Sequence, residues 1–147
     1  MSQTTYSFLD THCAIAGPGG AFSLTGGAAK EGITVQPAAE KNRLTIGADG
    51  SGMHALRADK SAKAIIRLLK NSPVNALLSA MYNFQQLNSS TWGQNTISIV
   101  SGVGDVITLR NVAFSKQPTV VYDEEGANNE WEFDAMYLDE LLAASVG

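Results

Sequence analysis

Hydrophobic and polar residues alternate with a period of two along much of this chain, as is typical of β-strands that bury one face. The clearest stretch is residues 130–138, which predicts a strand with an aromatic inner face and a carboxylate outer face. The predicted inner residues are Trp131, Phe133, Ala135 and Tyr137, and the outer ones are Glu130, Glu132 and Asp134. Further strands are predicted at residues 33–36, 43–48, 53–58, 96–100, 105–114 and 119–122. The strands at 43–48 and 53–58 are close enough, through a Gly-rich turn, to form a hairpin.

One segment instead repeats its apolar residues at helical spacing. Ser72 is a favourable N-cap, and Pro73 suits the first helical position. The pattern ends near residues 88–90, where polar residues follow one another. The apolar face of this helix is predicted to lie on a sheet, and its residues are Val74, Leu77, Leu78 and Met81.

Segment 61–70 fits two kinds of element. Its basic residues recur at intervals that suit one face of a helix, while its aliphatic residues also alternate as they would in a strand. Periodicity therefore does not decide between the two. With about seven to nine strands and one clear helix, the chain is predicted to be mainly β, a sandwich or small barrel flanked by a helix.

Charge is distributed unevenly, although 147 residues are the length of a single domain. Residues 1–116 hold all ten Lys and Arg and six acids, a net charge of +4, whereas residues 117–147 hold eight acids and no Lys or Arg, a net charge of −8. The two parts can pair within one subunit, pair between neighbours, or remain solvated faces. The overall charge of −4 is opposite in sign to that of a typical nucleic-acid binder.

No motif predicts catalysis, a cofactor or a metal. Residues 26–31 lack the Gly-Lys-Ser/Thr ending and the following helix that a phosphate loop requires. His12 and Cys13 are neighbours that would point to opposite faces of a strand, so they cannot easily share one ion. With two histidines and no nucleophile elbow, a hydrolase is not expected. No apolar run reaches the length of a membrane span, so no membrane partner is expected either.

A set of short runs follows one order over nearly the whole chain, and the ordered set is specific although each run alone is weak. The runs are YSFLD (6–10), GPGGAF (17–22), EGITV (31–35), IGADG (46–50), MH (53–54), RLLKNSPVN (67–75), WGQN (92–95), GDVI (104–107), AFSKQP (113–118) and NEWEF (129–133). Together they resemble the tail-tube proteins of contractile-tailed bacteriophages, Mu-like phages and their relatives. The resemblance implies two packed antiparallel sheets with a flanking helix, and it favours a strand for residues 61–70.

The resemblance also implies a structural role. It implies a single tail-tube domain over residues 1–147, with an N-terminal arm and extended loops at about 17–31 and 38–42 that neighbouring subunits would order. Such subunits, made in the host cytoplasm and found in the virion tail, form stacked hexameric rings around a channel for genome ejection. The implied partners are further copies of the chain, the tail sheath protein, the tape-measure protein, and the baseplate and tail-terminator proteins. No catalytic residue, cofactor or metal is implied.

Two other roles remain open, namely a tube terminator or other single-ring tail component, and a monomeric β-sandwich module that binds a ligand. The first would form one ring without polymerising. The second would expose an aromatic cleft and stay monomeric.

Two charged faces are the candidate assembly surfaces. The carboxylates Glu130, Glu132 and Asp134 are expected either to line the lumen, where they would repel DNA phosphate, or to meet the basic face of a neighbouring subunit. That basic face is formed by Lys63 and Arg67. We favour the lumen, because three carboxylates in a row repel one another unless water or cations screen them.

Overall fold

A computed structural model describes residues 11–24, 28–102, 104–118, 120, 122 and 128–142, without the side chains of residues 28–31. The predicted N-terminal arm, residues 1–10, lies outside this description. The described residues form nine strands and one helix. In chain order these are β1 (His12–Gly17), β2 (Gly20–Ser23), β3 (Ala28–Pro37), β4 (Asn42–Ile46), β5 (Gly52–Leu56), β6 (Ala62–Leu68), α1 (Val74–Gln85), β7 (Asn95–Val100), β8 (Val106–Lys116) and β9 (Asn129–Leu141).

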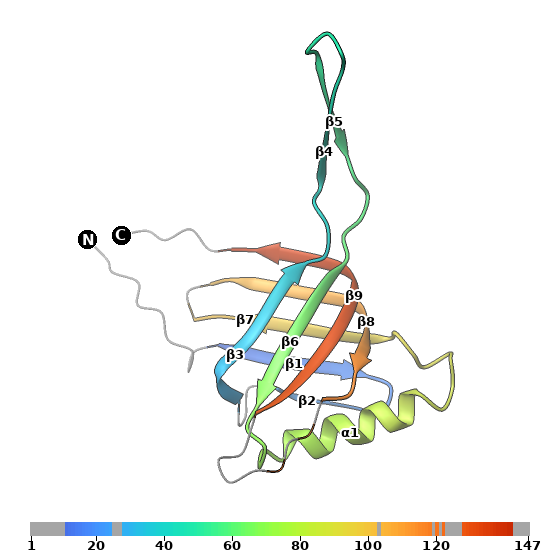
Figure 1. Cartoon of the computed structure of the whole chain (residues 1–147). Helices are drawn as coiled ribbons and strands as arrows, with labels where there is room; N and C mark the ends of the chain where they lie inside the picture. The colour runs from blue at the N-terminus through green and yellow to red at the C-terminus, as the bar shows by residue number, and fades with distance from the viewer. Residues whose placement is uncertain are drawn as a thin grey trace, which may run out of the picture.

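Seven strands form one antiparallel sheet in the order β2-β1-β7-β8-β9-β6-β3, and β4 pairs with β5 in a second, two-stranded sheet. The large sheet bends so that β3, β6 and the first part of β9 cross over β1 and β7 (Figure 1). Buried residues from both halves belong to one core cluster. The fold is therefore mainly β and sandwich-like with one flanking helix, as the sequence predicts.

Strand β6 resolves the ambiguity at residues 61–70. Its even-numbered residues, from Ala62 to Leu68, are buried in the core, and its odd-numbered residues are half-buried on the outer face. Each position is thus covered on both sides of the pleat, which is why an apolar or long aliphatic stem stands at nearly every one. The strand that the family resemblance favours is confirmed.

An aromatic cluster fixes the helix to both halves of the sheet. The ring of Phe114 on β8 lies 4.9 Å from that of Phe133 on β9 and 5.5 Å from that of Tyr82 on α1. Trp131 approaches Phe114 edge to face at 6.0 Å and donates its indole N–H to the Asn75 side-chain oxygen at 2.9 Å. Edge-to-face contacts of this kind add to the burial of the rings themselves.

The inward alternation of β9 continues through Trp131, Phe133 and Ala135 but ends before Tyr137, which is exposed. The neighbouring strand β8 explains this correction. Asn111 adopts a φ of 52°, the one positive value among the described non-glycine residues, and the register between β7 and β8 shifts there. The extra residue changes which side chains of β8 face the core, so that Leu109 and Val112, three residues apart, are both buried. Strand β9 stays in register with β8 there, so Leu138, opposite Leu109, contacts the core, while Tyr137, opposite Arg110, does not.

The second sheet is a hairpin that projects from the body, as predicted from residues 43–48 and 53–58 (Figure 1). In its turn, the backbone N–H of Gly47 donates to the Ser51 carbonyl at 2.7 Å, and the N–H of Gly50 donates to the Gly47 carbonyl at 3.0 Å. The Asp49 side chain accepts hydrogen bonds from the backbone N–H and the hydroxyl of Ser51, at 3.1 and 2.7 Å. These bonds hold the pKa of the Asp49 carboxyl below its usual value. Of the loop predicted at 38–42, residues 38–41 lead into the hairpin, and Asn42 is already the first residue of β4.

Two sequence expectations about strands need correction. The predicted loop at 17–31 contains strand β2 and the first residues of β3, while residues 25–27 lie outside the description. The predicted strand at 119–122 is absent at residues 120 and 122, and the other two positions lie outside the description. Strand β1 had no prediction of its own, because its short run of small residues next to a Gly-Pro-Gly-Gly turn carries little periodic signal.

Helix α1 begins at Val74, one residue later than expected, after Pro73 in helical conformation. The Ser72 hydroxyl still accepts the Val74 backbone N–H at 3.3 Å, as a capping serine does. Val74, Leu78 and Met81 are buried against the sheet. Leu77, predicted to lie on the same face, keeps 47% of its surface exposed, since it falls at the edge of the buried stripe and points outward.

Candidate assembly surfaces

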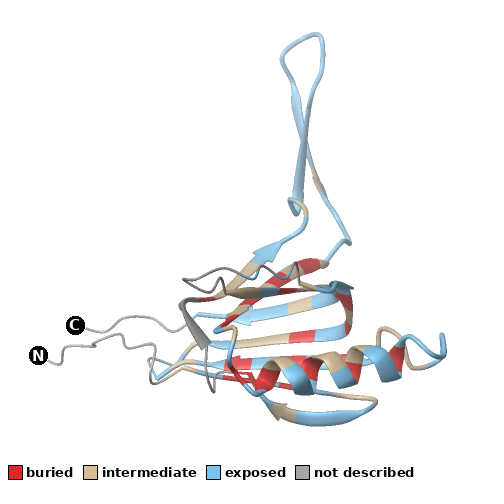
Figure 2. Cartoon of the chain, turned by 60° about the horizontal axis from the view of Figure 1, so that its bottom comes forward, coloured by how far each residue is buried: buried red, intermediate tan, exposed pale blue. Residues whose placement is uncertain are grey.

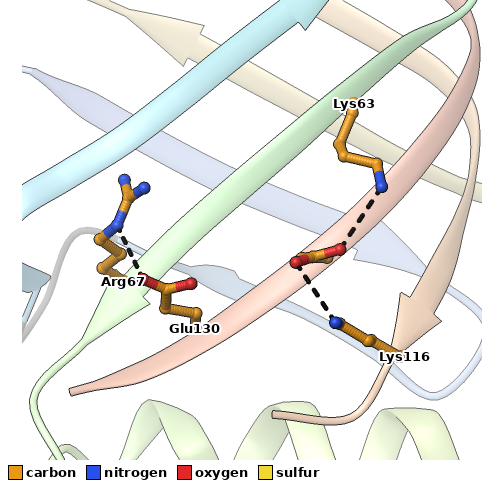
Figure 3. Close-up of polar contacts among 5 residues, drawn as sticks. Lys63, Arg67, Lys116 and Glu130 are labelled. Carbon is orange, nitrogen blue, oxygen red and sulfur yellow. Dashed lines mark hydrogen bonds and ion pairs between the residues drawn. The ribbon is translucent and has the colours of Figure 1, made fainter. Parts of the chain in front are cut away.

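The predicted acidic and basic residues meet on the outer face of the large sheet, within one chain (Figure 3). Strand β6 pairs antiparallel with β9, which places Arg67 opposite Glu130 and Lys63 opposite Asp134. The Arg67 Nε donates to Glu130 Oε1 at 3.2 Å, and its Nη1 donates to the Thr34 hydroxyl at 2.9 Å. The arginine is thereby fixed between strands β3 and β9.

Glu132 lies between two lysines. Its Oε2 is 3.4 Å from Lys63 Nζ on β6, and its Oε1 is 3.7 Å from Lys116 Nζ on β8. Glu132 is the more sheltered of the paired carboxylates, with 17% of its side chain exposed against 54% for Glu130. In each pair one member keeps 42 to 66% of its side chain exposed, and pairs at the surface contribute only about 0–1 kcal/mol, so these contacts set the charge of the face more than the stability of the fold.

This arrangement revises the expectation of two separate charged surfaces. The carboxylates and the cations, which the alternative to a lumenal place would put on opposite sides of a subunit boundary, share one face of one subunit. Three cations and three carboxylates balance there: Lys63, Arg67, Lys116, Glu130, Glu132 and Asp134. The face is consequently close to neutral before any neighbour arrives.

A buried amide pair, which the sequence analysis did not identify, holds the far end of the helix. Gln85 and Asn95 are fully buried and exchange two hydrogen bonds, at 2.6 and 2.9 Å. Gln85 also donates to the Pro18 carbonyl at 2.8 Å, and Asn95 to the Val112 carbonyl at 3.0 Å. A Cβ at Gly17 would overlap the Asn95 side-chain oxygen, so this position needs glycine. The network joins α1 to β7, β8 and the β1–β2 turn.

The residues of β4 and β5 are exposed to solvent, except for the half-buried Ala55 (Figure 2). Large apolar side chains are among them, namely Leu44, Ile46, Met53 and Leu56. An isolated two-stranded hairpin with exposed apolar residues is marginally stable in water and marks a surface that a partner covers. The hairpin is therefore a candidate assembly surface that the sequence analysis treated only as a local element.

Two hollows, of about 380 and 400 Å³, share Trp92 in their walls. Asp134 is the one ionisable side chain that lines either of them. No group of three His, Cys, Asp or Glu in the described part of the chain could hold a metal ion. His12 is exposed and Cys13 buried, on opposite faces of β1. None of the helices in the described ranges is long and apolar enough to cross a membrane.

Comparison with known proteins gives one family. The sequence matches the family described as bacteriophage PhiTE tail tube protein over residues 3–143, which is nearly the whole chain. A search of curated proteins found no match. The family match confirms the phage tail-tube protein that the ordered sequence runs resemble.

Proposed function

Because this chain belongs to the bacteriophage PhiTE tail tube family, and is thus a structural protein of the virion tail, we propose that its copies form hexameric rings. These rings stack into the channel through which the genome leaves. The observation that carries the proposal is the projecting β4–β5 hairpin, whose exposed apolar residues need a partner that a polymer of the same chain supplies.

The open edges of the large sheet support lateral association. Strands β2 and β3 end the strand order, so each has one edge without a partner strand among the described residues. Unpaired edges favour strand pairing with another chain, and closure into a ring removes them. Because the two edges differ, the contact is head-to-tail, and a head-to-tail contact closes into a ring when its rotation divides a full turn.

The face that holds Lys63, Arg67, Lys116 and the three carboxylates has balanced charge, which supports its placement on the channel wall. Glu130 and Glu132 already have cations of their own chain within 3.2 to 3.7 Å, so these two carboxylates do not require a neighbour's lysines. A wall with excess cations would hold DNA by counterion release, whereas a balanced one lets phosphate pass. We therefore propose that Glu130, Glu132 and Asp134, with their cationic partners, face the lumen.

In this proposal the tube belongs to a contractile tail. A sheath protein surrounds it, a tape-measure protein fills it during assembly in the host cytoplasm, and baseplate and terminator proteins cap its two ends. The role is structural and needs no catalytic residue.

Negative-stain microscopy of the concentrated protein, with sedimentation velocity, tests the proposal. Long hollow tubes with six-fold end views are expected. Isolated rings that never stack would instead favour the tube terminator. A monomer that persists at high concentration would contradict assembly and favour a monomeric binding module.

A further inference from the structure

Helix α1 and the loop after it carry no charge. Residues 71–104 contain no Asp, Glu, Lys or Arg, a run of 34 residues. A surface helix in a monomeric protein usually turns charged side chains to water. Here the outward side instead exposes Leu77, Phe84 and, just past the helix end, Leu87 at 81%. Loss of charge together with exposed large apolar residues characterises the centre of a protein interface.

The hairpin has a face of the same character. The register sets Leu44 opposite His54 and Asn42 opposite Leu56, and partners directly opposite share one face of a ribbon. Leu44, Ile46 and Leu56 therefore lie on one side, and Leu56 is 88% exposed. From Leu44 to Leu56 the sequence has one formal charge, Asp49, which stands at the tip and is hydrogen-bonded to Ser51.

These two uncharged surfaces lie at opposite ends of the molecule. The hairpin projects from one end of the body, and α1 lies along the other (Figures 1 and 2). Two different surfaces so placed associate head-to-tail. When the rotation between neighbours does not close a ring, such a contact repeats along an axis and produces an open stack. Hairpin against hairpin would instead give a closed pair and leave every helix uncovered.

We propose that the Leu44–Ile46–Leu56 face of one hairpin packs on the Leu77–Phe84–Leu87 face of α1 in a second copy of this chain, in the next ring. The inference rests on the proposed tube and names the surfaces that join its rings. Both surfaces match in lacking charge, so their contact buries no ion and carries no cost of charge desolvation.

Thiol cross-linking tests the contact. Ile46→Cys and Phe84→Cys are prepared as separate chains, mixed, assembled and treated with a short thiol-to-thiol cross-linker. The native Cys13 does not contribute, because it is buried. Covalent dimers are expected in the mixture and not in either variant alone. Val100→Cys on β7, also exposed, serves as the matched control and should give no dimer with Ile46→Cys.

The outcomes separate this inference from the tube itself. Tubes in the microscope without mixed dimers, or dimers from Ile46→Cys alone, overturn the contact and leave the tube function intact. A parent chain that forms no tubes overturns both.

A second variant keeps the test decisive if a cysteine substitution impairs folding. Leu87→Glu, at a position that is 81% exposed, should leave the thermal unfolding of the free subunit nearly unchanged and arrest assembly at single rings. Phe84→Glu should arrest assembly in the same way but also lower the unfolding temperature, because half of the Phe84 side chain is buried. Tubes of normal length from these variants would overturn the contact. So would tubes in which another tail protein, and not the hairpin of the next ring, covers α1.

Discussion

Two adjacent leucines on α1 differ in environment and should differ in energetic effect. Leu78 is fully buried in the core, whereas Leu77 is 47% exposed. Leu78→Ala should lower the free energy of unfolding of the free subunit by about 2–5 kcal/mol, since it leaves a cavity. Leu77→Ala should cost about 0.5 kcal/mol or less, as at other surface positions. Urea unfolding of the two variants measures the difference, and equal losses would mean that α1 packs in another orientation.

Cys13 should not react with thiol reagents in the folded subunit. Burial raises the pKa of its thiol from 9.0 to about 12, so that the reactive thiolate is scarce. We expect labelling by a thiol reagent at pH 8 only after unfolding.

The same pKa shift makes stability fall at alkaline pH. Between pH 9 and 12 the unfolded chain releases the Cys13 proton and the folded chain keeps it, so the free energy of unfolding declines as pH rises through this window. Cys13→Ala should remove that part of the slope in a pH series of urea unfolding. An unchanged slope would show that Cys13 ionises equally in both states.

At the level of single residues, the sequence predicted what strict periodicity encodes. Trp131 and Phe133 were placed inward because they alternate with carboxylates, and they are buried. The same alternation predicts Tyr137 to point inward, but Tyr137 is exposed, because the bulge at Asn111 lies on a different strand and leaves no mark in the sequence of β9. Gln85 and Asn95 were not predicted as a pair, because in the sequence alone a buried Gln or Asn cannot be distinguished from one on the surface. Only the fold shows that the two side chains meet.

The β4–β5 hairpin should be dispensable for folding and required for stacking. Its residues are exposed apart from the half-buried Ala55, so replacing residues 43–55 with a short Gly-Ser turn removes few contacts from the core. The shortened chain should unfold at nearly the same temperature as the parent but form no tubes. Differential scanning calorimetry and microscopy check the two parts. A large fall in the unfolding temperature would show that the hairpin supports the body.

Among the elements, those whose own residues carry a clear turn, cap or periodic pattern were predictable. The hairpin followed from two short strands around a Gly-rich turn, and the helix followed from its cap and spacing. Segment 61–70 was not decidable from its residues, because β6 is covered on both sides and every position suits either period. Family resemblance, rather than periodicity, identified it as a strand.

For the whole molecule, the sequence showed that charge was divided but not where the divided charges lie. Arg67 and Glu130 are 63 residues apart along the chain, yet they are direct partners across β6 and β9. This pairing depends on strand order, which alternation does not encode. Two charged regions that the sequence left free to pair within a subunit or between subunits consequently form one balanced face within a subunit.

Removing the carboxylates of this face should slow the ejection of the genome without preventing assembly of the tube. Glu130→Gln, Glu132→Gln and Asp134→Asn together leave Lys63, Arg67 and Lys116 without acidic partners on the proposed channel wall. Each ring would then attract DNA phosphate, and the attraction would weaken as salt rises, because it depends on counterion release. Ejection from phage carrying the variant tube should be slower at low salt and recover at high salt. Adding Lys63→Gln, Arg67→Gln and Lys116→Gln restores neutrality and should restore the rate. Intact tubes with normal ejection at low salt would place this face away from the channel, and failure to form rings would make it a contact between subunits.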